Sequence, residues 1–294
     1  MATLALEVLG SGGAVRTPRP GHHDVVDEGA RLHGVPWQRT GPSVFVHGPN
    51  VLIDTSEDIF FQLERSQVKQ IDAGFYSHWH PDHTAGRRVW ETMNADFLNQ
   101  PAHPRTTPIY LPPNVRHSFA ERGLAEHFAF LAARQWVTLH DFDGPLELAG
   151  WRITAHELHE AYVYAFLFEE IAPAAGGKAR RALICMDELF GWEPPAALCG
   201  VDLAYIPMGI PEFHPLTGDR LVAADHVVWQ AEASYVDSLA IAERLQAGKL
   251  IFGHIEGPFG LTPDQLAEMA KNLQRERGWD VTFAYDTLMV ELGA

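Results

Sequence analysis

The chain has 294 residues, of which 22 are basic and 38 acidic, and its formal net charge is −16. Surfaces that hold nucleic acid neutralise phosphates with Lys and Arg, so this charge argues against a nucleic-acid polymer as partner. The two cysteines, Cys185 and Cys199, imply no disulfide framework and fit a reducing compartment. No signal-peptide pattern opens the chain and no apolar run reaches about 18 residues, so we expect a cytoplasmic protein that does not enter a membrane.

The first part of the chain predicts a strand, a turn and a long loop. Residues 3–9 alternate as a strand does, and Gly10-Ser11-Gly12-Gly13 ends it. A plain turn is the favoured interpretation of these glycines, with a phosphate-binding loop as the alternative. Residues 14–41 are rich in Pro, Gly, His and Arg without any period, which predicts an irregular loop carrying a solvated His22-His23 pair.

A short apolar run then leads into a histidine-rich motif with the sequence His78-Trp79-His80-Pro81-Asp82-His83. If the backbone stays extended, His78 and His80 point to the same face, because side chains of a strand alternate. Pro81 turns the chain, so Asp82 and His83 can face the same point from the other side. Imidazoles with a carboxylate are the ligand set expected for Zn, Fe or Mn. The alternative is a histidine-rich loop in which Asp82 only caps the next helix.

The rest of the chain alternates between strand-like and helical stretches. Strands are predicted at 43–46, 51–54, 109–111, 151–158, 162–168, 182–186, 201–206 and 249–252, with two more near Val281 and Leu288. Helices are predicted at 59–68, 85–93, on both sides of Gly123, at 236–245 and from Thr262-Pro263 onward. Residues 207–234 form a second long loop. No linker or shift in composition divides the chain, which favours one domain over residues 1–294.

Several polar residues share one position, at or just past the end of an apolar strand-like run. They are His78, His159, Asp187 and His254. Because ligand sites in α/β sheets gather at the carboxyl ends of strands, these side chains could meet in one cleft. His156, three residues before His159, is a rival for the same place.

The motif at 78–83 resembles the His-x-His-x-Asp-His signature of the metallo-β-lactamase superfamily, and the resemblance reaches from Leu4 nearly to the C-terminus. It is most similar to the branch that holds tRNase Z and the cyclic phosphodiesterases of the carbon–phosphorus lyase pathway. The resemblance implies an α/β fold, an αββα four-layer sandwich, with two divalent metal ions. Zn is the expected metal, with Mn or Fe as alternatives.

The resemblance also implies which residues bind each ion. The first ion takes His78, His80 and His159, the second takes Asp82, His83 and His254, and Asp187 bridges them. The stretch Tyr164-Ala165-Phe166-Leu167 resembles the aromatic strand that follows the third histidine of the family, which favours His159 over His156.

The expected function is hydrolysis of a small phosphodiester, including cyclic ones, by a hydroxide held between two metal ions. Asp82 and Asp187 would lower the net charge of the site and orient the nucleophile. A leaving alkoxide needs a proton from a positioned acid. Where the carbon–phosphorus lyase-pathway enzymes have a histidine, this chain has Glu232, so Glu232 or the nearby His226 is the candidate acid.

Other functional classes stay open. The same hydroxide could attack the carbonyl of a lactone or thioester. Processing of tRNA 3′ ends is opposed by the negative charge and by the lack of a Lys/Gly-rich arm like that of tRNase Z. A non-catalytic metal-binding protein is a further alternative. Residues 14–41 contain no cysteine, so we expect no cysteine-built structural zinc. The expected partner is a small-molecule substrate, and a homodimer is left open.

Overall fold

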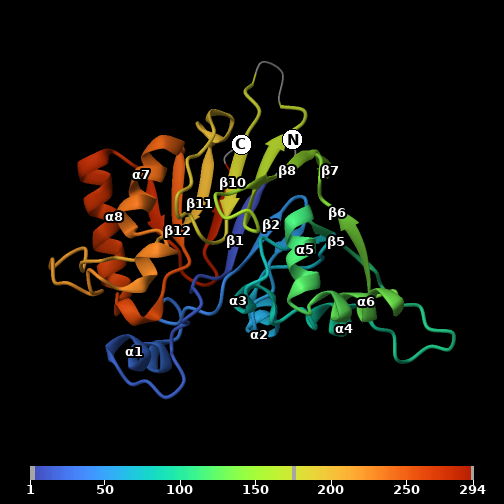
Figure 1. The fold of residues 1–294 in the computed structure, drawn as a ribbon. Helices are drawn as coiled ribbons and strands as arrows, with labels where there is room; N and C mark the ends of the chain where they lie inside the picture. Colours follow the sequence, from blue (N-terminus) through green and yellow to red (C-terminus); the bar gives the residue numbers. More distant parts are fainter. Residues whose placement is uncertain (1–3, 174–176, 293–294) are drawn as a thin grey trace.

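The computed structural model describes residues 4–173 and 177–292. Two seven-stranded mixed sheets stack face to face, and helices cover the outer side of each (Figure 1). The first sheet has the strand order β14 (Met289–Glu291), β1 (Ala5–Gly10), β2 (Ser43–His47), β3 (Val51–Ile53), β4 (Ala73–Phe75), β5 (Thr107–Leu111) and β6 (Val137–Asp141). The second has the order β13 (Val281–Phe283), β12 (Lys249–Gly253), β11 (Leu203–Pro207), β10 (Arg181–Cys185), β9 (Tyr164–Glu170), β8 (Trp151–Glu157) and β7 (Leu146–Leu148).

Each sheet has an antiparallel half and a parallel half. In the first sheet β14, β1, β2 and β3 pair antiparallel, and β3 to β6 pair parallel. In the second sheet β7 to β10 pair antiparallel, and β10 to β13 pair parallel. Parallel neighbours bring their carboxyl ends to one edge of the sheet, where ligand sites form.

The helices are α1 (Val25–His33), α2 (Ile59–Arg65), α3 (Pro81–Thr84), α4 (Val89–Asn94), α5 (Pro113–Glu121), α6 (Ala125–Ala133), α7 (Tyr235–Leu245) and α8 (Pro263–Arg277). Three short 3-10 turns are η1 (Ala196–Leu198), η2 (Val227–Gln230) and η3 (Gly257–Phe259). Helix α8 begins as the sequence predicts, because Thr262 and Gln265 form a reciprocal capping box before a proline in the first turn. None of the helices in the described ranges is long and apolar enough to cross a bilayer.

The central core lies between the two sheets. It joins Val8 and Phe75 of the first sheet to Phe166 and Tyr205 of the second, and all four side chains are buried. Full burial of an apolar side chain of this size stabilises the fold by roughly 1.5–3 kcal/mol. This interface therefore holds the two sheets face to face.

Two further cores lie on the outer faces of the sheets. On the second sheet, Phe252 packs with Leu245 of α7 and Met269 of α8. On the first sheet, Ile109 packs with Trp90 of α4, and the other helices on that side complete this core. Three cores between four layers make an αββα sandwich, so the predicted fold class is confirmed.

The prediction of one irregular loop over residues 14–41 was wrong, because Val25–His33 form α1. Asp24 caps this helix by accepting hydrogen bonds from two backbone N–H groups of the first turn, and Gly34 ends it with a φ of 65°. Acidic residues in the first turn and basic ones in the last add favourable dipole interactions. The helix also buries one face, which includes Val26 and Ala30. The Pro- and Gly-rich composition of the surrounding segment led to the prediction of a loop.

The alternative in which Asp82 only caps the next helix was also wrong. Helix α3 already begins at Pro81, and His80 stands at its cap position without a side-chain cap bond. Asp82 lies inside the first turn, where its side chain is free to face other groups. The predicted helix over residues 85–93 is shorter than expected, since α4 begins only at Val89.

Candidate metal centre

Four chain segments carry polar residues from strand ends to one place. His78 follows β4 after Tyr76 and Ser77, and Asp187 follows β10 after Met186. His254 comes directly after β12, and Asp54 directly after β3. Each strand buries apolar side chains on both faces, and these polar residues follow within a few positions of the strand's end.

Three overlapping groups of side chains place their metal-binding atoms within 4.8 Å of one another, and one of them joins Asp54 to His78 and His83. The other two consist of ligand candidates that the sequence predicts. The first of these two groups is His78, His80 and Asp187, and the second is Asp82, His83 and His254. These are the sets that the family resemblance implies, apart from His159. All of these side chains come from the ends of β4, β10 and β12 or from α3.

Asp187 lies between the two groups. Its Oδ2 is 3.3 Å from Nε2 of His78 and 3.6 Å from Nε2 of His83, and its Oδ1 is 3.4 Å from Nε2 of His254. In the second group, Oδ2 of Asp82 is 3.3 Å from Nε2 of His83 and 3.6 Å from Nε2 of His254. One carboxylate thus faces donors of both groups, which is the position of a bridging ligand.

The donor atoms themselves indicate that a cation belongs here. Buried atoms without a hydrogen-bond partner include Nε2 of His78, His83 and His254, and Oδ2 of Asp82. Each such atom costs about 1–3 kcal/mol when nothing satisfies it. They converge on one point from different elements, and a divalent ion bound among them would satisfy them together. Nitrogen donors with two carboxylates suit Zn, Mn or Fe.

The electrostatics of the cluster are those of a cation site. Burial lowers the pKa of His78 to about 4, so its imidazole is neutral, the form that binds metal. Burial opposes a charge on Asp187, but His254 and His78 outweigh it and hold the pKa of Asp187 well below its usual value. Burial also opposes a charge on His83, yet Asp82 and Asp54 raise its pKa well above 6.5. The extra proton on His83 takes the place of a cation, and metal binding would release it.

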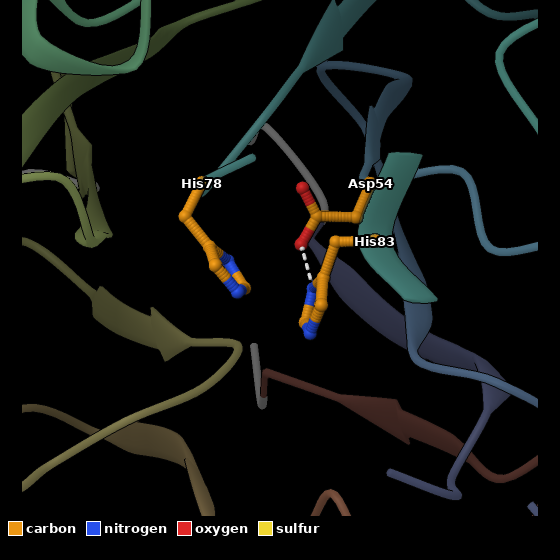
Figure 2. A group of neighbouring side chains, drawn as sticks. All are labelled: Asp54, His78 and His83. Atoms are coloured by element: carbon orange, nitrogen blue, oxygen red, sulfur yellow. Dashed lines mark hydrogen bonds and ion pairs between the residues drawn. The ribbon is translucent and has the colours of Figure 1, made fainter. Parts of the chain in front are cut away.

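Asp54 orients the histidines from outside the centre. Figure 2 shows its carboxylate bonded to the ring of His83, where Nδ1 donates to Oδ2 over 2.7 Å. Ser77 donates to Asp54 through its backbone N–H over 2.7 Å and through its hydroxyl over 2.6 Å. The oxygen of the same hydroxyl lies 3.0 Å from Nδ1 of His78 and can accept a hydrogen bond from it. In the neutral form that binds metal, both imidazoles would therefore carry their proton on Nδ1 and leave Nε2 for the ion.

The role of Asp54 was missed in the sequence, where it is only the last residue of a predicted strand. The available signal was its position, directly after an apolar run, which it shares with Asp187 and His254. Its partner His83 lies 29 positions further along the chain.

His159 is not brought into either group among the described residues. It is exposed in a bend after β8, where Leu158 N–H donates to the carbonyl of Val163 over 2.9 Å. Its ring lies against Gly191, at which a Cβ atom would be 2.9 Å from Cδ2 of the histidine. The rival His156 also lies outside both groups, with Nε2 2.8 Å from the hydroxyl of Thr154. That His159 binds the first ion stays a prediction.

A cavity of about 410 Å³ opens onto the centre. Asp187 and His254 line it, and both candidate acids, Glu232 and His226, line it as well. Burial, with Glu188 as the next cause, raises the pKa of Glu232 to about 9. His226 is exposed, and its Nδ1 accepts a hydrogen bond from the backbone N–H of Val228 over 3.1 Å.

Comparisons with known proteins agree with this geometry. Residues 49–176 match the family model described as the beta-lactamase superfamily domain. A diphosphatase of the PhnP family has a similar structure, with a TM-score of 0.68 and 24% identity over 98% of this chain and 97% of its own. The metallo-β-lactamase fold protein YhfI from Bacillus subtilis has a TM-score of 0.63 and 17% identity over 99% of this chain and 100% of its own.

Zn²⁺-bound PqqB from Methylobacterium extorquens has a TM-score of 0.67 and 15% identity over 97% of this chain and 99% of its own. No curated protein sequence matches the chain. The four-layer arrangement of the chain is therefore the metallo-β-lactamase fold. The match to the beta-lactamase superfamily model over residues 49–176 includes the histidine motif at 78–83, in agreement with the resemblance that this motif shows.

Proposed function

We propose that the chain is a metal-dependent hydrolase of small phosphodiesters, with Glu232 as the acid that protonates the leaving group. The observation that carries the proposal is that one cavity is lined both by residues of the metal centre and by a carboxyl group whose pKa is raised to about 9. A cavity of about 410 Å³ suits a small molecule. The likeness to a diphosphatase of the PhnP family supports phosphoester chemistry.

The residues of the centre form two ligand sets, one for each metal ion. His78, His80 and Asp187 would hold one divalent ion, with His159 as the predicted further ligand, and Asp82, His83 and His254 the other. Such a pair of ions supplies Lewis acidity toward an ester oxygen and lowers the pKa of a water molecule.

Around the ions, Asp54 and Ser77 fix the orientation of two ligand rings. The pKa of Glu232 is raised to about 9 by burial and by Glu188, so this carboxyl group could hold a proton at neutral pH and donate it to the leaving oxygen. Glu188 accepts a hydrogen bond from the backbone N–H of Ala233 over 3.1 Å, which fixes the neighbour that helps keep Glu232 protonated.

A carbonyl ester is the second candidate substrate. Among the described residues, no lysine or arginine lines the cavity, whereas Glu188, Glu232 and Glu256 do. An uncharged lactone or thioester needs no positive side chain for recognition, and the centre could activate water toward its carbonyl equally well. The same acidic lining, with the net charge of −16, speaks against a tRNA substrate.

Kinetics on three substrates separate these candidates. The metal-loaded protein would be assayed with bis-p-nitrophenyl phosphate, a lactone and a thioester at matched concentrations. The proposal expects the largest kcat/KM for the phosphodiester. A preference for the lactone or thioester would replace it by the second candidate, and no turnover of any of them would favour a metal-binding protein without catalysis.

Replacing Glu232 by Gln should slow a diester with an alkyl leaving group far more than bis-p-nitrophenyl phosphate. An alkoxide needs a proton in order to leave, whereas p-nitrophenolate does not, and general acid catalysis contributes about 10²–10⁴-fold. Since the acid works in its protonated form, activity on the alkyl diester should fall as the pH rises through about 9, the pKa of Glu232. This alkaline decline should be absent in Glu232→Gln.

His226→Asn is the matched comparison, because His226 lines the same cavity but is exposed. We expect it to lose little on either diester. Equal losses on both substrates in Glu232→Gln would show that Glu232 positions or binds the substrate and does not protonate it. A selective loss on the alkyl diester in His226→Asn would transfer the acid role to His226.

A further inference from the structure

The glycine-rich turn after β1 is interlocked with the segment that carries His254. The backbone N–H of Ile255 donates to the carbonyl of Ser11 over 2.9 Å, and that of Gly257 donates to the carbonyl of Val15 over 2.8 Å. Residues from opposite ends of the chain thus form one wall of the cavity beside the last metal-ligand candidate.

Glu256 completes this connection with its side chain. Its Oε1 accepts a hydrogen bond from the backbone N–H of Ala14 over 2.9 Å, and its Oε2 accepts one from that of Val15 over 2.8 Å. Its Oε1 also lies 3.7 Å from Nδ1 of His254, an ion-pair distance. The N–H groups that could have held a substrate phosphate are therefore occupied by a carboxylate of the chain itself, which favours the plain turn over a phosphate-binding loop.

Gly13 and His254, on the two sides of the Glu256 carboxylate, restrict where this carboxylate and the imidazole can lie. A Cβ atom at Gly13 would lie 2.2 Å from Oε1 of Glu256 and 2.7 Å from Nδ1 of His254, so a side chain there would displace these groups. His254 has a φ of 50°, in the left-handed region. For a residue other than glycine this conformation costs about 1–3 kcal/mol and persists only where the surroundings enforce it. The contacts beside His254 are the hydrogen bonds that join Ile255, Glu256 and Gly257 to the glycine-rich turn.

We propose that Glu256 is a positioning residue that, tied to Ala14 and Val15, holds the imidazole of His254 with Nε2 facing Asp82 and Asp187. It would thereby set the affinity for the ion that Asp82, His83 and His254 bind. The inference rests on the metal centre of the proposed function but is independent of the substrate. Loss of a partner behind a metal-bound histidine typically weakens metal affinity by about 10–100-fold.

The test is the metal affinity of Glu256→Gln, measured by competition with a chromogenic chelator and by the visible absorption of bound Co²⁺. We expect one of two ions to bind about 10–100-fold more weakly and the other to bind as in the wild type. The matched control is Glu7→Gln. Glu7 is a buried glutamate that also accepts from a backbone N–H, that of Gln67 over 2.9 Å, and contacts a histidine, His47, over 2.7 Å. It lies outside the cavity lining, so both ions should keep their affinity.

A second variant reaches the same contact without touching Glu256. Gly13→Ala must displace the carboxylate, so it should weaken the same ion, whereas Gly144→Ala has open space around it and should change nothing. Thermal unfolding of the metal-free variants checks that each chain is folded. The inference would be overturned if Glu256→Gln bound both ions as the wild type does, or if it lost only folding stability. An equal loss of metal affinity in Glu7→Gln would overturn it as well. Intact metal binding with no phosphodiester cleavage would instead count against the proposed function alone.

Discussion

Replacing Asp187 by Ala is expected to abolish hydrolysis while the chain stays folded. Its two carboxylate oxygens lie 3.3–3.6 Å from Nε2 of His78, His83 and His254, which belong to both donor groups. Removing this carboxylate takes negative charge from both ion positions at once. Since the partners of Asp187 are other ligand candidates and not the apolar core, the fold does not depend on it. His254→Ala should act in the same way on the second group.

The measurements are kcat/KM on bis-p-nitrophenyl phosphate, metal content by elemental analysis and circular dichroism. Asp27→Ala is the matched control, because Asp27 is a buried carboxylate bonded to the backbone N–H of Arg19 over 2.7 Å, away from the cavity. This control should lose about 1–3 kcal/mol of stability and keep its metals. The ligand role of Asp187 would be contradicted if Asp187→Ala kept the turnover of the wild type. It would also be contradicted if Asp187→Ala aggregated while Asp27→Ala stayed folded.

Removing the metals should lower the unfolding temperature of the chain substantially. The buried atoms Nε2 of His78, His83 and His254 have no hydrogen-bond partner, so an ion that binds them favours the folded state over the unfolded one. An ion at 100 times its dissociation constant stabilises the folded state by about 2.7 kcal/mol. Thermal unfolding with chelator, and again after Zn²⁺ is returned, measures the difference. Equal unfolding temperatures in the two states would contradict the metal centre.

The chelated chain should also respond to pH in a defined direction. Burial opposes a charge on His254, but Asp187 overcomes this and the pKa of His254 is raised to about 9. A raised histidine pKa adds stability that is complete below the unfolded value of 6.5 and is lost as the pH rises through about 9. Bound metal replaces this proton, so the metal-loaded chain should lack the decline.

Much of the centre could be predicted because its signals are local in the sequence. His78, Asp187 and His254 each follow a short apolar run, and such runs form buried strands whose ends meet in this fold. The start of α8 was equally visible, since a threonine cap and a proline occupy adjacent positions. In these cases the physical cause of the structure lies within a few residues.

Other features depend on contacts that no local pattern carries. Helix α1 is short and lies within a segment rich in Pro and Gly, so the composition of that segment predicted a loop although the helix has a cap and a buried face. Asp54 acquires its role only through the hydrogen bond to His83. Glu256 meets Ala14 and Val15 across nearly the whole chain, which only the folded arrangement of β1 and β12 brings about. The bend that leaves His159 exposed is likewise set by backbone contacts.

The central claim is that this chain holds two metal ions in one catalytic centre. The most direct measurement is a titration of the metal-free protein with Zn²⁺, in which bound metal per chain and the rate of phosphodiester hydrolysis are followed together. The two donor groups that meet at Asp187 predict binding of two equivalents, with full activity reached only when the second has bound. Full activity at one equivalent or less would contradict the claim.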